Sequence, residues 1–245
     1  MGLVILVPVL GRPQNVAPLA ESIRVNTATE HRLLWLCSPG DEDQIAACRR
    51  TDGEVMVMAW EAGKADFAKK INHAFTHTSE PWLFQAADDL RFSPHWDVHA
   101  LAVADHKNRG VIGTNDLGNP SVKRGVHSTH TLFSRTYIET HGGTVDRSGV
   151  VFSEAYDHQW CDNEFIETAK ARGQFAFCRR AVVEHLHPHW GKSKMDATYE
   201  KAVANSRKDR ELFAQRMRFV RTPELRRERQ QAKRVERLAR RRMPR

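Results

Sequence analysis

Residues Trp82–Asp97, with the sequence WLFQAADDLRFSPHWD, contain the pattern that decides the fold. The first six residues form a short apolar run that predicts a buried strand and leads directly into Asp88 and Asp89. Ser93-Pro94 then marks the start of a helix. An apolar strand that ends in carboxylates is costly unless these groups reach water or hold a cation. Because ligands of open α/β sheets bind at the carboxyl ends of strands, we expect the functional site here.

Apolar runs and helical spacing alternate along the chain, which is typical of a parallel sheet wound with right-handed crossovers. We expect buried strands at residues 2–10, 32–37, 54–60, 82–87, 110–114, 127–133 and 175–186. We expect helices at residues 14–27, 43–50, 65–78, 97–107, 135–141, 160–172 and from 196 onward. The predicted fold class is therefore α/β, with a mostly parallel central sheet flanked by helices.

The positive charge of the chain is concentrated at its C-terminal end. The 245 residues carry a net charge of +8, and residues 207–245 contain 16 Lys or Arg against five Asp or Glu. The preceding 206 residues hold 22 basic and 25 acidic side chains. We therefore expect a domain at 1–206 and a basic helical tail at 207–245. The tail would bind an acidic partner surface, an anionic membrane face or nucleic acid, or else be a solvated helix or disordered extension.

No apolar run approaches the length needed to span a membrane. The N-terminus, MGLVILVPVLGRP, lacks a basic region and a cleavage site, so it predicts a first strand rather than a signal peptide. The four cysteines are scattered and form no CxxC pair, which indicates a reducing compartment. Together these features predict a cytoplasmic protein.

Two acidic groups could carry chemistry. Asp88 and Asp89 either hold a divalent cation or form an Asp-rich turn that caps the next helix. Asp162 and Glu164 stand at the start of a predicted helix, where acids favour the helix dipole. A carboxylate at that position could also act as a general base if the fold brings it within reach of a hydroxyl.

Histidines near the end of the last predicted strand form a third candidate group. In an extended strand His185 and His187 point to the same side, so both imidazoles could face one ion, or both could lie at the surface. Such a ligand set suits Mn²⁺ or Mg²⁺ better than Zn²⁺, because no cysteine set accompanies it. Lys64 and Asn72 flank the start of the third helix, where Lys64 would meet a phosphate or remain solvated.

In this order and spacing, the motifs resemble the nucleotide-sugar-dependent glycosyltransferases of the GT-A fold, similar to the family-2-type enzymes, over residues 3–192. The segment VILVPVLGRPQNV resembles the family's first strand and the loop that touches the nucleotide. The resemblance thus assigns to the nucleotide-sugar site the residues Pro8, Val9, Gly11, Arg12, Lys64, Asn72, Asp88 and Trp190. It also implies a GT-A-type, Rossmann-like sheet.

The segment WLFQAADDLRF resembles the family's acidic DxD-type motif. In that comparison Asp89 matches the metal-binding second Asp, and Asp88 lies in the middle. Ala87 replaces the first Asp, so Asp88 would have to supply the ribose contact. EHLHPHW resembles the C-terminal histidine element that completes the metal site, with His185 or His187 as the ligand.

WCDNEF resembles the family's ED-type motif, in which Asp162 matches the catalytic base, Cys161 replaces the usual Glu, and Glu164 follows as a second candidate acid. The set GTNDLGNP, HSTHTLF, DNEF and HLHPHW is most similar to phage-encoded members, whose products would lie in the host cytoplasm. The acceptor is unknown, with proteins among the candidates.

The resemblance implies transfer of a sugar from a nucleoside diphosphate to an acceptor hydroxyl, assisted by Mn²⁺ or Mg²⁺. Asp162 as base would give inversion, whereas a retaining route stays open if Asp162 cannot reach the anomeric centre. One alternative is a nucleotidyltransferase, although the first loop offers only Gly11-Arg12 in place of a Gly-rich phosphate cradle. A second alternative is a protein that binds nucleic acid or an anionic surface through its basic tail.

Overall fold

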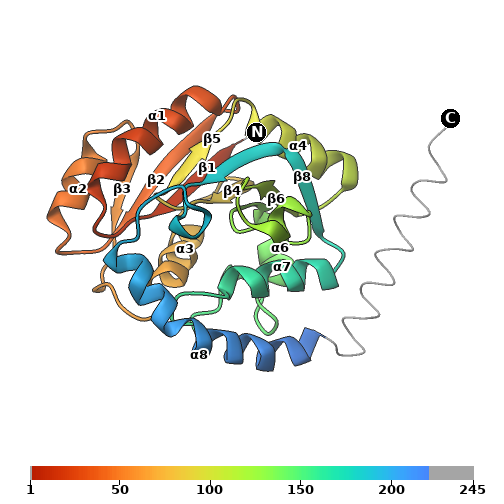
Figure 1. The fold of residues 1–245 in the computed structure, drawn as a ribbon. Helices are drawn as coiled ribbons and strands as arrows, with labels where there is room; N and C mark the ends of the chain where they lie inside the picture. The colour runs from red at the N-terminus through yellow and green to blue at the C-terminus, as the bar shows by residue number, and fades with distance from the viewer. Residues whose placement is uncertain (1, 221–245) are drawn as a thin grey trace.

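The computed structural model describes residues 2–220, in which helices cover both faces of one central sheet (Figure 1). The strands are β1 (Leu3–Pro8), β2 (His31–Cys37), β3 (Glu54–Val57), β4 (Trp82–Gln85), β5 (Leu90–Phe92), β6 (Val111–Asn115), β7 (Thr131–Ser134) and β8 (Phe175–His185). The α-helices are α1 (Val16–Asn26), α2 (Glu42–Arg49), α3 (Asp66–Thr76), α4 (Trp96–Lys107), α5 (Pro120–Lys123), α6 (Arg135–His141), α7 (Cys161–Ala171) and α8 (Ala197–Val220). Two 3₁₀ helices, η1 (Pro13–Asn15) and η2 (Pro188–Trp190), complete the described elements.

The sheet confirms the predicted α/β fold class. Its strand order is β3-β2-β1-β4-β7-β6-β8-β5. The four N-terminal strands β1 to β4 pair in parallel, as the alternating pattern predicts, and β6 pairs in parallel with β8. Strand β7 lies antiparallel between β4 and β6. Antiparallel neighbours need no crossover helix, and here only a loop with the short helix α5 joins β6 to β7.

Strand β1 is apolar throughout because both faces of the sheet are covered. Leu3, Ile5 and Val7 face a core formed with α1, α2 and α4. Val4 and Leu6 face the opposite core, formed with α3, α6 and α7. This arrangement fixes the central strands in place and leaves their carboxyl ends, with the loops that follow them, to form the site.

The sequence pattern predicts no element at Leu90–Phe92, yet the structure has a strand there. These residues form β5, which pairs antiparallel with the second half of β8 in the register Leu90↔His185. The first half of β8 pairs with β6, and the register shifts between Gly113 and Asn115. Only a long-range pairing reveals β5, since three residues are too few to show a period.

Helix α8 is continuous across residue 206, where the sequence predicts a domain boundary. It lies beside α7 (Figure 1), and the rings of Trp160 and Phe213 are 5.1 Å apart. The division into residues 1–206 and a basic tail stays a prediction, because residues 221–245 lie outside the described part of the chain.

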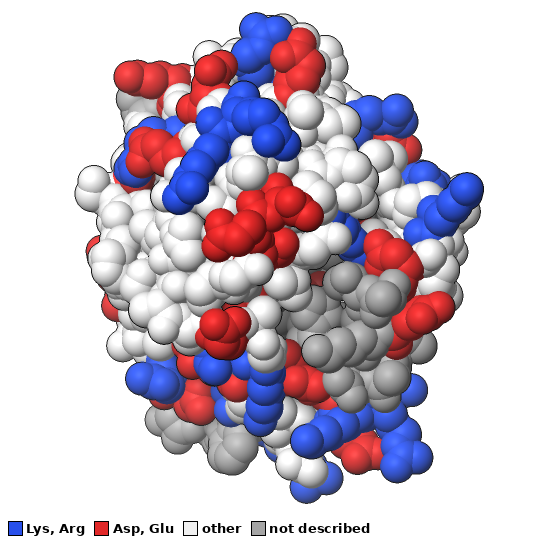
Figure 2. Space-filling model, turned by 90° about the vertical axis from the view of Figure 1, so that its left-hand side faces the viewer, with Lys and Arg blue, Asp and Glu red and all other residues white. Residues whose placement is uncertain are grey.

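The described surface mixes the two signs of charge. Figure 2 shows one face of the molecule, on which Lys and Arg side chains are interspersed with Asp and Glu. This distribution agrees with the near balance of charge in the first 206 residues. Within residues 2–220 every helix is too short or too polar to cross a bilayer.

Candidate active site

The chain leaves β1 through Pro8 and Val9, which two buried contacts hold in place. The backbone N–H of Val9 donates to the carbonyl of Leu36 on β2 at 3.1 Å. The carbonyl of Val9 accepts a hydrogen bond of 2.9 Å from the ammonium of Lys70 on α3, which is 1% exposed and also pairs with Asp66 at 2.7 Å. The buried charge of Lys70 is thus fully engaged in the scaffold beneath the loop.

The loop after β1 places the Arg12 side chain beside the acidic residues that follow β4. Gly11 has a φ of +64°, a conformation that glycine adopts without strain. Its N–H donates to Asp41 at 2.7 Å, and the N–H of Arg12 donates to the side chain of Gln44 at 2.8 Å. The guanidinium of Arg12 then reaches Asp88, with Nη1 3.1 Å from Oδ1. Arg12 therefore lies beside Asp88, whereas Gly11 is bound to Asp41.

Asp88 is 8% exposed, and the pKa of its carboxyl differs from the usual value of an aspartate. Burial raises the pKa of Asp88 to about 7, the charge of neighbouring Asp89 adds to the increase, and Arg12 opposes it. The two adjacent acids, Asp88 and Asp89, thus differ in pKa, because the low-dielectric site disfavours two uncompensated negative charges.

Asp89 contacts the end of β8. His185 Nε2 lies 3.1 Å from Asp89 Oδ2, and the hydroxyl of Tyr199 donates to the same oxygen. Burial tends to raise the pKa of Asp89, but these hydrogen bonds hold it below its usual value. The other oxygen, Oδ1, is buried and has no hydrogen-bond partner among the described residues. An ionised carboxylate with one buried oxygen unmet is a strong candidate ligand.

His130 lies at the centre of the titratable groups. Its ring centroid is 4.8 Å from that of His185, and Gln85 Nε2 lies 3.2 Å from its Nδ1. Burial and, to a smaller extent, the neighbouring imidazole of His185 together lower the pKa of His130 to about 3, so the ring is neutral. His130 also interacts electrostatically with Asp89 and Asp162. It therefore links the strand-end acids to the first turn of α7.

Asp162 lies in that first turn with a histidine partner. His127 Nε2 is 3.3 Å from Asp162 Oδ2, and the Asp162 side chain is 25% exposed. Burial tends to raise the pKa of Asp162, but the contact with His127 lowers it below its usual value. At neutral pH the group is an ionised, partly accessible carboxylate, which is the state a general base requires.

Glu164 is in a different situation, although it lies only two residues away. It is 1% exposed, and Arg216 donates to both of its oxygens at 2.6 and 2.8 Å. Tyr156 and the N–H of Val145 donate to it as well, at 2.7 and 2.9 Å. With both oxygens engaged and no solvent access, Glu164 braces α7 against α8, and the structure gives it no position from which to touch a substrate.

Asn72 and Lys64 also make their contacts elsewhere. The Asn72 amide oxygen accepts from the N–H groups of Val151 and Phe152, and its nitrogen donates to the Phe152 carbonyl at 2.9 Å. Asn72 thus holds the loop that precedes α7.

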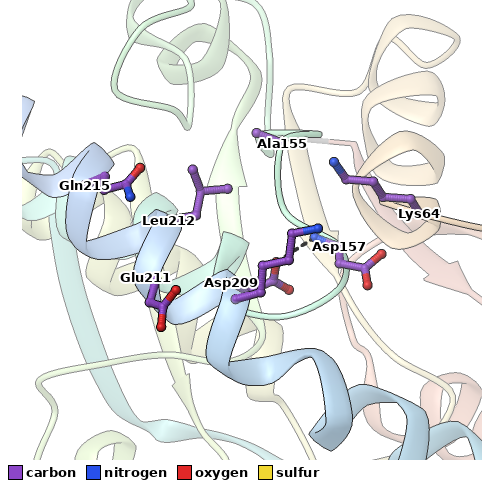
Figure 3. Close-up of a pocket in the computed structure, with 8 residues that line it drawn as sticks. Lys64, Ala155, Asp157, Asp209, Glu211, Leu212 and Gln215 are labelled. Atoms are coloured by element: carbon purple, nitrogen blue, oxygen red, sulfur yellow. Dashed lines mark hydrogen bonds between the residues drawn. The ribbon is translucent and has the colours of Figure 1, made fainter.

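Lys64 lines a separate cavity of about 220 Å³ between residues 155–157 and α8 (Figure 3). Arg12, Asp88 and Asp89 are absent from the lining of that cavity, whose described residues are Lys64, Ala155, Asp157, Lys208, Asp209, Glu211, Leu212 and Gln215.

His185, rather than His187, contacts the acid. The His187 ring lies 4.9 Å from the His185 ring, although β8 ends at His185 and His187 lies directly before η2. Its Nδ1 accepts the N–H of His189 at 3.0 Å, and burial, aided by His185, lowers the pKa of His187 to about 4. Trp190 follows in η2 and packs on Gly118, where an added Cβ would come within 2.6 Å of the indole.

Asp196 and Tyr199, from the start of α8, belong to the same cluster, and sequence reasoning missed them. Asp196 accepts two hydrogen bonds of 2.9 Å from Arg12, and the Arg12 Cζ lies 4.1 Å from the centre of the Tyr199 ring. The only local signal is an Asp before a helical pattern, which predicts a helix cap and not a contact 184 residues away.

The residues around Asp89 fit a divalent cation. The unmet Asp89 Oδ1 offers an oxygen ligand, and His185 Nε2 would offer a nitrogen ligand once it no longer donates to Asp89 Oδ2, a combination that Mn²⁺ accepts. Within residues 2–220 no three His, Cys, Asp or Glu side chains converge well enough to hold a metal ion alone. Two protein ligands suit an ion that shares its coordination with phosphate oxygens.

Solved structures share this fold. A mannosyltransferase from Pyrobaculum calidifontis, in complex with GDP-Man and Mn²⁺, superposes with a TM-score of 0.59 at 14% identity, over 75% of this chain and 56% of that one. Glucosyl-3-phosphoglycerate synthase from Mycobacterium tuberculosis, in complex with Mn²⁺, UDP and phosphoglyceric acid, gives 0.60 at 12% identity, over 91% and 79%. S. aureus TarS 1-349 in complex with UDP-GlcNAc gives 0.54 at 13% identity, over 80% and 62%.

No protein-family model matches the sequence, and a comparison with curated proteins found no match. The chain spans less than two thirds of the mannosyltransferase and of the TarS fragment. At these identities the likeness concerns the fold alone. The chain therefore has the GT-A-type, Rossmann-like fold that the sequence motifs predict, the fold of nucleotide-sugar glycosyltransferases.

Proposed function

We propose that this protein is a glycosyltransferase that moves a sugar from a nucleoside-diphosphate donor to an acceptor hydroxyl. The grouping of Arg12 and Asp88 with Asp89 and His185 carries the proposal. A buried guanidinium binds diphosphate oxygens through its fork of donors, and an acid with an imidazole binds the accompanying cation. The structural neighbours that contain Mn²⁺ with GDP-Man or UDP support this choice of ligands.

Asp89 and His185 would hold Mn²⁺ or Mg²⁺, with Asp89 Oδ1 as the oxygen that now has no partner. The bound ion would neutralise the charge that develops on the departing diphosphate. Arg12 would add a second positive charge on the same leaving group. Asp88 would accept a hydrogen bond from a hydroxyl group of the sugar nucleotide. The backbone at Pro8, Val9 and Gly11 would line the nucleotide pocket. Trp190 would offer an aromatic face to the sugar.

Asp162 would remove the proton from the acceptor hydroxyl. Its lowered pKa makes it an ionised carboxylate, and its 25% exposed side chain is accessible from solvent. The hydroxyl oxygen would form the new bond to the anomeric carbon, the bond to the diphosphate oxygen would break, and Asp162 would hold the proton. Attack from the face opposite the diphosphate would invert the anomeric configuration. Glu164 would take no part in this step, since Arg216 and Tyr156 donate hydrogen bonds to its carboxylate.

Calorimetric titration tests the proposal. UDP, GDP and dTDP are titrated with and without Mn²⁺, and donor hydrolysis is followed for each corresponding sugar nucleotide. We expect saturable, Mn²⁺-dependent binding of at least one nucleoside diphosphate. Asp89→Asn should remove the Mn²⁺-dependent part, whereas Asp105→Asn, which alters an exposed acid on α4, should leave binding unchanged.

Absence of binding for every nucleoside diphosphate, in the wild type and in Asp196→Asn and Tyr199→Phe, would contradict the proposal. Release of pyrophosphate from a nucleoside triphosphate and a sugar phosphate would favour the nucleotidyltransferase alternative instead. The acceptor, with proteins among the candidates, and the resemblance to phage-encoded members remain predictions. The predicted contacts of the basic tail fall largely on residues 221–245, outside the described part of the chain.

A further inference from the structure

Residues 196–199, which we call the strap, occupy the candidate donor site. Arg12 Nε and Nη2 each donate to one oxygen of Asp196 at 2.9 Å. Tyr199 donates its hydroxyl to Asp89 Oδ2, and its ring lies 4.1 Å from the Arg12 guanidinium carbon and 4.5 Å from the His187 ring centre. The strap thus contacts both the arginine and the acid of the site.

The chemistry of the strap matches that of the ligands it faces. A carboxylate that accepts two parallel hydrogen bonds from a guanidinium uses the same fork of donors that a phosphate group uses. Asp196 and a diphosphate therefore compete for Arg12. Tyr199 likewise donates to Asp89 Oδ2, and this hydrogen bond weakens the carboxylate as a ligand, since its other oxygen, Oδ1, would bind the cation.

The strap is more accessible than the residues it covers. The Asp196 side chain is 42% exposed, whereas the Arg12 side chain is 9% exposed. Release of Asp196 therefore transfers a carboxylate to water at modest cost, and a diphosphate can replace it on a guanidinium that stays buried.

The second half of α8 is fixed independently. Asp209, 2% exposed, accepts the backbone N–H groups of residues 157–159 at 2.8 to 2.9 Å. Arg216 is bound to Glu164 and Asp146. The helix can therefore remain attached to the domain while its first turn leaves the site.

We propose that Asp196 and Tyr199 form an autoinhibitory strap, which a nucleoside diphosphate and its cation displace from Arg12 and Asp89. This inference rests on the proposed function, because it names the diphosphate donor as the competitor. It predicts that removal of the strap's charge or hydroxyl tightens ligand binding. If these residues merely complete the site, the same changes weaken binding.

Two substitutions test the strap with little disturbance of the fold. Asp196 Oδ1 also accepts the N–H of Tyr199 at 3.1 Å and so caps α8. Asp196→Asn keeps a capping oxygen and removes the charge. Tyr199→Phe keeps the ring on Arg12 and removes the hydroxyl. Glu200→Gln is the matched control, since it neutralises an exposed acid next to the strap.

The measurements are calorimetric Kd values for UDP and GDP with Mn²⁺, and the Kd of Mn²⁺ alone from the electron paramagnetic resonance signal of the free ion. We expect Asp196→Asn to lower the Kd of the bound nucleoside diphosphate about fivefold. We expect Tyr199→Phe to lower the Kd of Mn²⁺ by about the same factor. Glu200→Gln should match the wild type in both.

An unchanged or higher Kd in both strap variants, with the wild type binding a nucleoside diphosphate, would overturn the strap and leave the proposed function standing. Absence of nucleoside diphosphate binding in every variant would overturn both. Binding that appears only in the strap variants would support both. Thermal melting of each variant checks that the fold is retained.

Discussion

Asp89 and Glu164 are two buried carboxylates that both contact α8, yet their oxygens are satisfied to different degrees. Glu164 is 1% exposed, and donors occupy both of its oxygens. Asp89 is 8% exposed, and its Oδ1 has no partner among the described residues. Burial alone does not distinguish a functional acid from a structural one. The unmet oxygen supports the proposed role of Asp89, because a buried polar atom without a partner is costly unless a ligand meets it.

The largest effect is expected from Asp89→Asn. This change replaces one carboxylate oxygen with an amide nitrogen and removes the negative charge that a cation needs. We expect donor hydrolysis to fall about 100-fold or more, and the Mn²⁺ affinity to fall with it. Stopped assays with the accepted sugar nucleotide measure donor hydrolysis, and the electron paramagnetic resonance signal of the free ion measures the Mn²⁺ affinity. Retention of Mn²⁺-dependent activity would show that the unmet oxygen does not mark the ligand.

Glu164→Gln should have the opposite pattern of effects, with a loss of stability and little change in activity. The change leaves the Arg216 guanidinium beside a neutral amide in a buried position. We expect the free energy of unfolding to fall by about 2–3 kcal/mol, while kcat of the folded enzyme changes little. Urea unfolding at 25 °C gives the first value. Glu167→Gln, on the same helix with a 45% exposed side chain, is the control and should cost little. A loss of kcat with unchanged stability would reassign Glu164 to the chemistry.

Asp209→Asn should lower the free energy of unfolding by less than Glu164→Gln does. Asp209 accepts three backbone N–H groups of residues 157–159, and an amide has only one accepting oxygen. We expect a loss of about 1–2 kcal/mol and faster hydrogen exchange at those three amides. Glu211→Gln, exposed on the same helix, should leave exchange unchanged. Exchange that stays slow in Asp209→Asn would mean that other contacts hold this loop.

Substitution of Asp97 is expected to change stability the least. It extends the comparison to the pH dependence of stability. Asp97 is fully buried, and its oxygens accept the N–H groups of Ala28 and Thr29 at 3.2 and 2.6 Å. Burial tends to raise the pKa of Asp97, but these bonds lower it below the usual 3.8. A depressed pKa in the folded state stabilises the protein above pH 3.8, and that contribution is lost as the pH falls through the folded-state pKa.

We therefore expect Asp97→Asn to cost about 1 kcal/mol at pH 7. The difference from the wild type should narrow below about pH 4, where the wild-type carboxyl also becomes neutral. Urea unfolding at a series of pH values measures the difference. A gap that stays constant down to pH 3 would mean that the charge of Asp97 contributes nothing to stability.

The sequence predicted the central strands well because burial on both faces leaves a continuous apolar run, which β1 and β4 show clearly. It also predicted that Asp89 and a histidine of the HLH segment would come together, and the Asp89–His185 contact confirms their proximity. Both predictions depend on local patterns that the sheet geometry translates directly into position. The roles of these residues stay proposals.

The remaining contacts could not be predicted because they join residues far apart in the chain. Arg216 and Glu164 are 52 residues apart, and Arg12 and Asp196 are 184 apart. No periodicity in either segment indicates the partner. Asn72 shows the same limit, since its motif suggests a nucleotide contact whereas its side chain binds the backbone of residues 151–152.

The pairing of β5 with β8 has a consequence for how Asp89 and His185 are held relative to each other. His185 faces Leu90, the residue after Asp89, across an antiparallel ladder, so hydrogen-bond register sets the position of the imidazole. Insertion of one residue within the second half of β8 would turn a different side chain toward the acid. The loop of residues 116–130 also contributes to this placement, since the Asp116 carbonyl accepts the N–H of His185 at 3.1 Å and the His130 ring lies 4.8 Å from the His185 ring. The spacing of Asp89 and His185 therefore depends on the backbone register of β5 and β8 as well as on the two side chains.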